Sequence, residues 1–170
     1  MSSNGNQKNI MIITQYFFPT ENKNYEIKEE IEKLASEGHN ISVVTSKSSS
    51  DTPIEITNTK FYYIDQDKFT GNGEWAYVFH NISFMWKAIK LGSAVPGNFD
   101  MIVATIPSGF AGIAANIVAG KKSAKFYLDT KENWVESALA ANYLSKGSPI
   151  HKAAVIVENW INKRGEKFTL

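Results

Sequence analysis

The sequence contains no cysteine, and this absence excludes disulfide bonds and thiolate metal sites. It also lacks any apolar run close to the roughly 20 residues that a membrane-spanning helix needs. Residues 1–8 are polar and lack the apolar core of a signal peptide, so we expect a flexible N-terminal tail and a cytoplasmic protein. The formal net charge is only +1, which gives no general attraction to nucleic acid, and we expect no nucleic-acid partner.

Glycine is absent between Ile10 and Glu37, where a dinucleotide-binding fold carries its glycine-rich phosphate loop. Only glycine lets the backbone approach a pyrophosphate closely there, so the sequence argues against a nicotinamide oxidoreductase. Nucleophile-elbow and Walker motifs are absent as well. The histidines at positions 39, 80 and 151 are far apart in sequence, and no pair has metal-ligand spacing, so we predict no metal site.

What the sequence does contain is an alternation of strand and helix patterns. Residues 10–13 form a purely apolar run, typical of a strand that is covered on both faces. Residues 25–37 follow a helical period that Gly38 ends, and residues 41–46 form a second strand. A strand, a helix and a strand at this spacing make a βαβ unit, whose crossover is expected to be right-handed.

The rest of the chain continues this alternation. Further strands are predicted at 61–64, 99–105 and 124–129, and further helices at 75–91, 110–120, 132–144 and from Pro149 onward. In the 75–91 helix, the apolar residues that fall on one face are Phe79, Ile82, Trp86 and Ile89. We therefore predict a single Rossmann-like α/β domain over residues 9–170. Its mostly parallel open sheet should have about five or more strands, with helices on both faces.

Ligands of such sheets bind outside the carboxyl ends of the strands. The loop after the first strand offers Gln15, Tyr16, Glu21 and Asn22 as polar groups that would line a substrate site. The alternative is a loop that simply packs its aromatic residues on the core.

A second candidate lies after the strand at 124–129. Asp129 ends this strand, and its carboxylate, or that of Glu132, could bind sugar hydroxyls or accept a proton, while Trp134 could stack on a sugar face. The alternative is that Asp129 caps a helix and Glu132 interacts with its dipole. Ser108 and Gly109 precede another helix, whose N-terminus is either an anion site or an ordinary short turn.

Two longer stretches carry a resemblance. The first is IMIITQYFFPTENKNYEIKEEIEKLASEGHNISVVTS, and the second is DMIVATIPSGFAGIAANIVAGKKSAKFYLDTKENWVESA. The first resembles a strand, a Q-Y-[FY]-x-P-E loop, a helix ending L-x-x-x-G-H and a V-x-V-V-T strand. The second is similar to a strand, a proline loop, an alanine-rich helix and an LD-x-R-D-x-W-P-E-S segment. Together they resemble glycosyltransferase family 4, of the GT-B fold, and in particular its capsular and exopolysaccharide enzymes.

The resemblance implies an enzyme of two Rossmann-like domains, in which the N-terminal domain holds the acceptor and the C-terminal domain holds the nucleotide-sugar donor. This chain resembles the N-terminal domain alone. It would be the acceptor-binding half of a sugar-nucleotide-dependent glycosyltransferase in surface polysaccharide assembly, inactive by itself. Its partners would be a C-terminal donor-binding domain or subunit and a saccharide or lipid-linked saccharide acceptor. The acceptor-binding residues so implied are Gln15, Tyr16, Glu21, Asn22 and Trp134, with Asp129 or Glu132 near the reacting hydroxyl.

The chain departs from the family pattern at three places, and the first two of them favour another hypothesis. Residues 22–24 stand where the family has a glycine pair, Lys131 and Glu132 replace an Arg-Asp pair, and Val135 replaces a proline. Lysine cannot reproduce the bidentate contact of an arginine. The alternative is a stand-alone, non-catalytic α/β binding or regulatory module that has kept the fold.

Basic residues cluster near the end of the sequence, at Lys152, Lys163, Arg164 and Lys167. Such a cluster is typical of a solvated helix face. The alternative is a peripheral contact with a membrane, since capsule-type acceptors are often lipid-linked.

Overall fold

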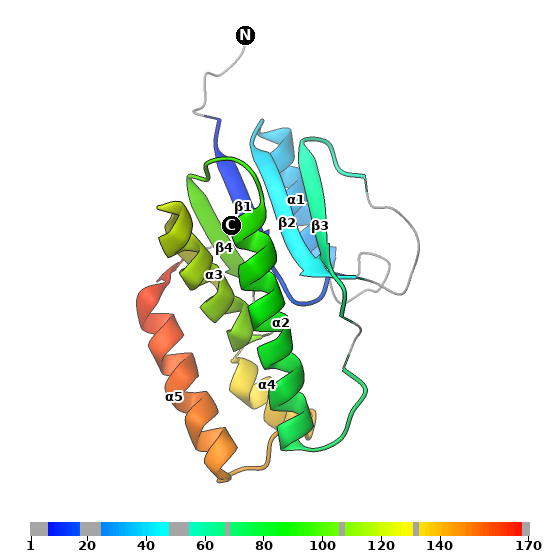
Figure 1. The fold of residues 1–170 in the computed structure, drawn as a ribbon, viewed down its shortest axis with the longest axis vertical. Coiled ribbons are helices and arrows are strands. Elements are labelled where there is room, and N and C mark those ends of the chain that lie inside the picture. Colours follow the sequence, from blue (N-terminus) through cyan, green and yellow to red (C-terminus); the bar gives the residue numbers. More distant parts are fainter. Residues whose placement is uncertain are drawn as a thin grey trace.

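Six parallel strands form the central sheet of the described part of the chain, in the order β3-β2-β1-β4-β5-β6 (Figure 1). This computed structural model describes residues 7–17, 25–47, 55–66, 69–105, 108–130 and 133–167. The strands are β1 (Asn9–Ile13), β2 (Asn40–Ser46), β3 (Thr59–Ile64), β4 (Met101–Thr105), β5 (Lys125–Asp129) and β6 (Glu166–Lys167). Every pairing between them is parallel, as the alternation of strands and helices predicts.

The helices in the described residues are α1 (Tyr25–Ser36), α2 (Glu74–Ala94), α3 (Gly109–Lys122), α4 (Trp134–Ala140) and α5 (Pro149–Arg164). α1 covers one face of the sheet, and α2 and α3 pack beside each other on the opposite face (Figure 1). The strand order 3-2-1-4-5-6 is that of a doubly wound Rossmann sheet, which confirms the predicted fold class. Its order reverses between β1 and β4, and this point is where ligands of such sheets bind.

Both faces of the sheet are apolar, because both are covered. Ile10, Ile12 and Val43 point to the α1 side, where they meet the apolar stripe of that helix. Met11 and Ile13 point to the other side and pack under α2 and α3. This two-sided burial explains why the strands have no polar alternation in the sequence.

α2 does not bury the whole apolar face that its sequence period predicts, which consists of Phe79, Ile82, Trp86 and Ile89. Phe79 and Trp86 are each 63% exposed, whereas Tyr77, Phe84 and Ala88 on the other side of the helix are buried. The helix is apolar on almost every side, so its period alone does not identify the face that packs on the core.

Several element boundaries differ from the predicted ones, and one strand is additional. α4 ends at Ala140 instead of continuing to residue 144, and the chain turns there, with Asn142 at a φ of +58°. α3 continues through Gly120 to Lys122 and ends at Ser123, whose φ is +54°. β6 was not predicted, because two residues are too few to give a sequence pattern. The predicted N-cap at Ser148 is confirmed, since its side chain accepts a hydrogen bond from the His151 N–H at 3.0 Å.

The predicted tail of residues 1–8 lies mostly outside the described residues. Of its last two residues, Lys8 is hydrogen-bonded to the chain that leads into β2. Its N–H donates to Nδ1 of His39 at 3.3 Å, and its carbonyl accepts from the N–H of Asn40 at 2.9 Å.

Candidate functional site

Buried polar side chains gather at the carboxyl edge of the sheet. Among the described residues, the buried polar or charged side chains are Thr14, Gln15, Thr45, Ser46, Asn81, Thr105, Ser108 and Asp129. Thr45, Ser46, Thr105 and Asp129 lie in the last two residues of β2, β4 or β5, and Thr14 and Gln15 follow β1. Ser108 directly precedes α3, and Asn81 lies on α2. Burying polar groups is costly, so their collection at one edge, and at no other place in the described residues, points to a site.

The loop after β1 is held firmly at this edge. The Thr14 N–H donates to the carbonyl of Val44 at 3.1 Å, and the carbonyl of Gln15 accepts from the Ser46 N–H at 3.3 Å. Phe17 is buried and stacks on Phe61 with ring centroids 5.5 Å apart. The loop therefore packs an aromatic residue on the core, as one of the two alternatives expects, and the role of Gln15 and Tyr16 in a substrate site stays a prediction.

The hydroxyl of Tyr16 is the centre of a hydrogen-bond network. It accepts from the Phe69 N–H at 3.4 Å and from Nε2 of Gln15 at 3.4 Å, and it lies 3.0 Å from Nε2 of His80. Since its oxygen already accepts two hydrogen bonds, its own hydrogen is best donated to His80. Nε2 of His80 is then the acceptor, and Nδ1 carries the ring proton.

The charges in this network are suppressed by burial. Burial raises the pKa of the Tyr16 phenol, against a smaller opposing effect of the Phe69 N–H. Burial lowers the pKa of His80, and the nearby Lys87 acts in the same direction. At neutral pH both groups are therefore uncharged, and they are suited to hydrogen bonding with neutral hydroxyls.

Aromatic rings pack together beside Tyr16. Tyr77 and Tyr143 stack with centroids 5.0 Å apart, and Phe69 meets them edge-on at 5.7 and 5.4 Å. Burial raises the pKa of Tyr77 to about 12, with Tyr16 and Tyr143 adding to the shift. Phe69 and Tyr143 are half-buried, so this cluster forms a partly accessible aromatic wall.

Residues that the sequence analysis did not assign complete this network. The sequence spacing shows His80 only as one of three histidines that are far apart, and no motif indicates Phe69, Tyr77 or Tyr143. The one sequence feature that could indicate His80 is its position in the first turns of α2. This helix begins near the carboxyl edge of the sheet, so its first turns lie beside the loop after β1.

Ser108 and Gly109 lie on the other side of the switch point, at the start of α3. The Ser108 hydroxyl donates to Oδ1 of Asn81 at 3.2 Å and does not cap α3. A Cβ on Gly109 would lie 2.5 Å from Cε2 and Nε1 of the Trp134 indole. Glycine is therefore needed here for close packing, and the geometry of these residues is that of a packed turn.

Trp134 is only 3% exposed, and its ring packs on Gly109 and edge-on against Phe110 at 5.9 Å. A ring in this position cannot stack on a sugar. Its role in the structure is to form part of the wall between α3 and α4, so the predicted stacking role is not supported by its placement.

Asp129 is 7% exposed and lies beside Thr105 in the register of β5 and β4. Its strand is separated from β1 by β4, so strand spacing places it about 10 Å from the loop that carries Tyr16. The other predicted residues of this region and of the first loop, Glu21, Asn22 and Glu132, lie outside the described residues.

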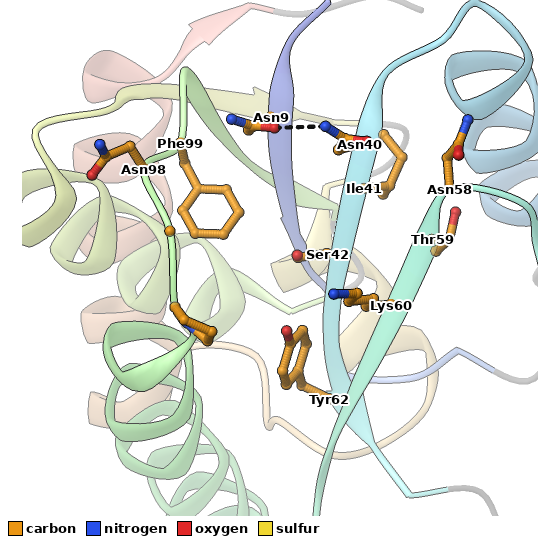
Figure 2. Close-up of a pocket in the computed structure, with 12 residues that line it drawn as sticks. Asn9, Asn40, Ile41, Ser42, Asn58, Thr59, Lys60, Tyr62, Asn98 and Phe99 are labelled. Atoms are coloured by element: carbon orange, nitrogen blue, oxygen red, sulfur yellow. Dashed lines mark hydrogen bonds between the residues drawn. The ribbon is translucent and has the colours of Figure 1, made fainter.

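A cavity of about 580 Å³ lies at the opposite edge of the sheet (Figure 2). It is formed by the amino ends of the strands and by the segment after α2, with Ser42, Lys60, Tyr62 and Phe99 among its lining residues. None of the predicted site residues lines it, so this cavity is separate from the polar carboxyl edge.

Two features are absent from the described residues. No group of three or more His, Asp or Glu side chains there is arranged to hold a metal ion. No helix in these ranges combines the length and the apolar character that crossing a membrane requires.

Comparison with known proteins identifies the fold. No family model matches the chain, and no curated protein matches it either. Among solved structures, it is similar to sucrose-phosphate synthase from Thermosynechococcus elongatus, with a TM-score of 0.68 and 14% sequence identity. The match covers 94% of this chain and 41% of that chain, so the chain spans less than half the length of this structural neighbour.

Proposed function

We propose that this chain is the acceptor-binding half of a sugar-nucleotide-dependent glycosyltransferase. The fold is shared with a protein named as a sucrose-phosphate synthase, and the shared part is 41% of that chain. The two stretches that resemble glycosyltransferase family 4 include β1 and the loop after it, and β4 to α4. Both stretches therefore border the edge where buried polar groups gather.

The observation that carries the proposal is the network around Tyr16. Its phenol, the imidazole of His80 and the amide of Gln15 form an uncharged set of donors and acceptors beside a wall of aromatic rings. Neutral polar groups suit the hydroxyls of a saccharide, and aromatic faces suit the apolar face of its ring. We assign Tyr16 and His80 to binding and orienting the acceptor, and we assign Gln15, which is 1% exposed and donates to the Tyr16 hydroxyl, to positioning that hydroxyl.

Sugar transfer would need a carboxylate near the reacting hydroxyl and a bound nucleotide-sugar donor, and this chain would supply only the first. A carboxylate near the reacting hydroxyl would come from Asp129 or Glu132. The nucleotide-sugar donor would be held by a C-terminal domain or a separate subunit, because proximity of donor and acceptor requires both halves. We therefore expect the chain alone to bind an acceptor and not to transfer sugar.

The finer assignment is to surface polysaccharide assembly. It rests on the Q-Y-[FY]-x-P-E-like loop at Gln15–Pro19 and on the Leu128–Asp129 segment before Trp134, which resemble capsular and exopolysaccharide enzymes. The acceptor would then be a saccharide or a lipid-linked saccharide.

A second candidate function is a non-catalytic binding or regulatory module. The burial of Trp134 favours it, because the aromatic residue that would stack on an acceptor is committed to packing on Gly109. This hypothesis keeps the same edge as a binding surface but requires no donor domain.

The mass of the natural protein in its own cells separates the two candidates. An antibody raised against this chain would detect a product of about twice 19.0 kDa if a donor domain of ordinary size is attached. A product of 19.0 kDa that co-purifies with no second subunit would contradict the transferase proposal and favour the binding module.

A further inference from the structure

The outer side of α2 carries a line of large apolar side chains. Trp75, Phe79 and Trp86 are 66%, 63% and 63% exposed, and Ile82 lies between them on the same side of the helix. The spacing of four, three and four residues places all of them opposite the buried face of the helix. Figure 1 shows α2 on the outside of the molecule, with the sheet behind it.

These side chains form a patch and are not scattered. Half of the exposed large hydrophobic residues in the described ranges lie on this one line; the others are Tyr63, Ile156 and Trp160. The rings of Trp75 and Phe79 are in contact, with centroids 6.1 Å apart. Single exposed apolar residues are ordinary, but a contiguous set on one helix marks an interaction surface.

Positive charge lies at the C-terminal end of the same surface. Lys87 and Lys90 of α2 are exposed, and the neighbouring helix α3 contains no acidic residue and ends in Lys121 and Lys122. The Lys122 ammonium donates to the carbonyl of Val95 at 2.6 Å, which holds the ends of the two helices together.

No carboxylate of α2 or α3 balances these cations at that end. Glu74 is the one acid of the two helices, and it lies at the opposite end of α2. It is engaged there by the N–H of Ser145 at 2.6 Å and by the hydroxyl of Ser148 at 2.7 Å. Asp65, which follows β3, contacts Lys87 through its backbone carbonyl.

From these features we propose that the outer face of α2 binds the surface of an anionic lipid bilayer. Tryptophan is enriched at the boundary between lipid and water, and an apolar line flanked by lysines is typical of helices that lie in that boundary. The exposed Lys90 and Lys121 would face anionic headgroups, while the aromatic rings would enter the interface. A second copy of the chain fits less well, because this face has cations and offers them no carboxylate.

This surface stands independently of the proposed function. It also differs from the basic cluster on α5 that the sequence suggested, because α5 exposes two large apolar side chains, Ile156 and Trp160, and carries the acidic Glu158 between them. It would hold the carboxyl edge near a membrane, because His80 of the same helix belongs to the network around Tyr16.

Co-sedimentation with lipid vesicles tests the inference. The chain should sediment with vesicles in which about one third of the lipid is phosphatidylglycerol, and much less with phosphatidylcholine vesicles or in about 1 M salt. The W75S/F79S/W86S variant should partition about tenfold less into the anionic vesicles. The matched control is I156S/W160S on α5, which removes two other exposed apolar side chains and should bind as the unchanged chain does.

Several results would overturn the inference. Equal binding of W75S/F79S/W86S and I156S/W160S to the anionic vesicles would do so. A wild-type chain that stays in the supernatant with these vesicles, and that is a dimer in the analytical ultracentrifuge, would also do so. If W75S/F79S/W86S does not fold, K90E/K121E takes its place, and unchanged binding of that variant to the anionic vesicles would count against the inference. Because the assay contains no sugar, its outcome does not depend on the transferase proposal.

Discussion

The phenol oxygen of Tyr16 lies 3.0 Å from Nε2 of His80, although 64 positions separate the two residues in sequence. This bond joins the loop after β1 to the first half of α2. It fixes the polar groups that face the carboxyl edge, and the first two predictions test it.

Replacing Tyr16 with phenylalanine should lower the free energy of unfolding by about 1–2 kcal/mol, because His80, Gln15 and the Phe69 N–H all lose a partner. The ring itself stays, so packing should change little. Chemical denaturation of both proteins measures the difference. Replacing Tyr63 with phenylalanine provides the control and should have an effect near zero, because this side chain is 44% exposed and its phenol has no hydrogen-bond partner among the described residues. An equal loss in both variants would contradict the network.

His80 should titrate at a lower pH than an ordinary histidine, since burial lowers its pKa from 6.5. The pKa of His80 in the folded state lies below its value in the unfolded state. The stability that neutral His80 contributes is therefore present above pH 6.5 and is lost as pH falls through the folded-state pKa. In Tyr16→Phe the midpoint should move upward, because the neutral ring loses a donor. Nitrogen NMR of the imidazole measures both midpoints. A His80 midpoint at or above 6.5 would show that the ring is solvated instead of packed.

Gly109→Ala should destabilise the fold by about 1–3 kcal/mol, because the new Cβ would lie 2.5 Å from the Trp134 ring. Gly120→Ala in the same helix is the matched control. Position 120 is exposed with no atom within 4 Å, so alanine there should stabilise by about 0.5–1 kcal/mol through helix propensity. Thermal unfolding of both variants measures the contrast, and Trp134 fluorescence should change only in Gly109→Ala.

Glu74 should make the junction between α2 and the 145–148 turn sensitive to acid. The N–H of Ser145, followed by the hydroxyl of Ser148, lowers the pKa of Glu74 from 4.5. The stability that ionised Glu74 contributes to the folded state is therefore present above pH 4.5, and it is lost as pH falls through the lowered folded-state pKa. In Glu74→Gln this part of the pH dependence of Tm should disappear. Glu29→Gln, at an exposed position on α1, should leave the wild-type profile unchanged.

Position after a strand predicts that Gln15 and Tyr16 lie at the carboxyl edge of the sheet, where the structure places them. Gln15 and Tyr16 follow the first apolar run, and any open parallel sheet brings that point to the ligand-binding edge. His80 could not be found in this way, because it lies within a helix that is apolar on almost every side. Its partner is fixed only by how that helix packs on the sheet.

Local sequence patterns gave wrong predictions for Trp134 and for the end of the helix at 132–144, because tertiary packing determines both. Trp134 follows a strand and has the chemistry to stack on a sugar, but the missing side chain of Gly109 leaves room for its ring inside the domain. The predicted helix at 132–144 ends early, and this turn is what brings Tyr143 against Tyr77. Both outcomes depend on contacts between segments that are distant in sequence.

The central claim is that the carboxyl edge around Tyr16 binds a saccharide acceptor and not the nucleotide-sugar donor. Its most direct test is amide NMR of the chain, titrated separately with a panel of methyl hexosides and with a nucleotide sugar. The account predicts that a hexoside shifts the amides of Gln15, Tyr16, Phe69 and His80, while the nucleotide sugar leaves them unchanged. Shifts at this edge from the nucleotide sugar, with none from any hexoside, would contradict it.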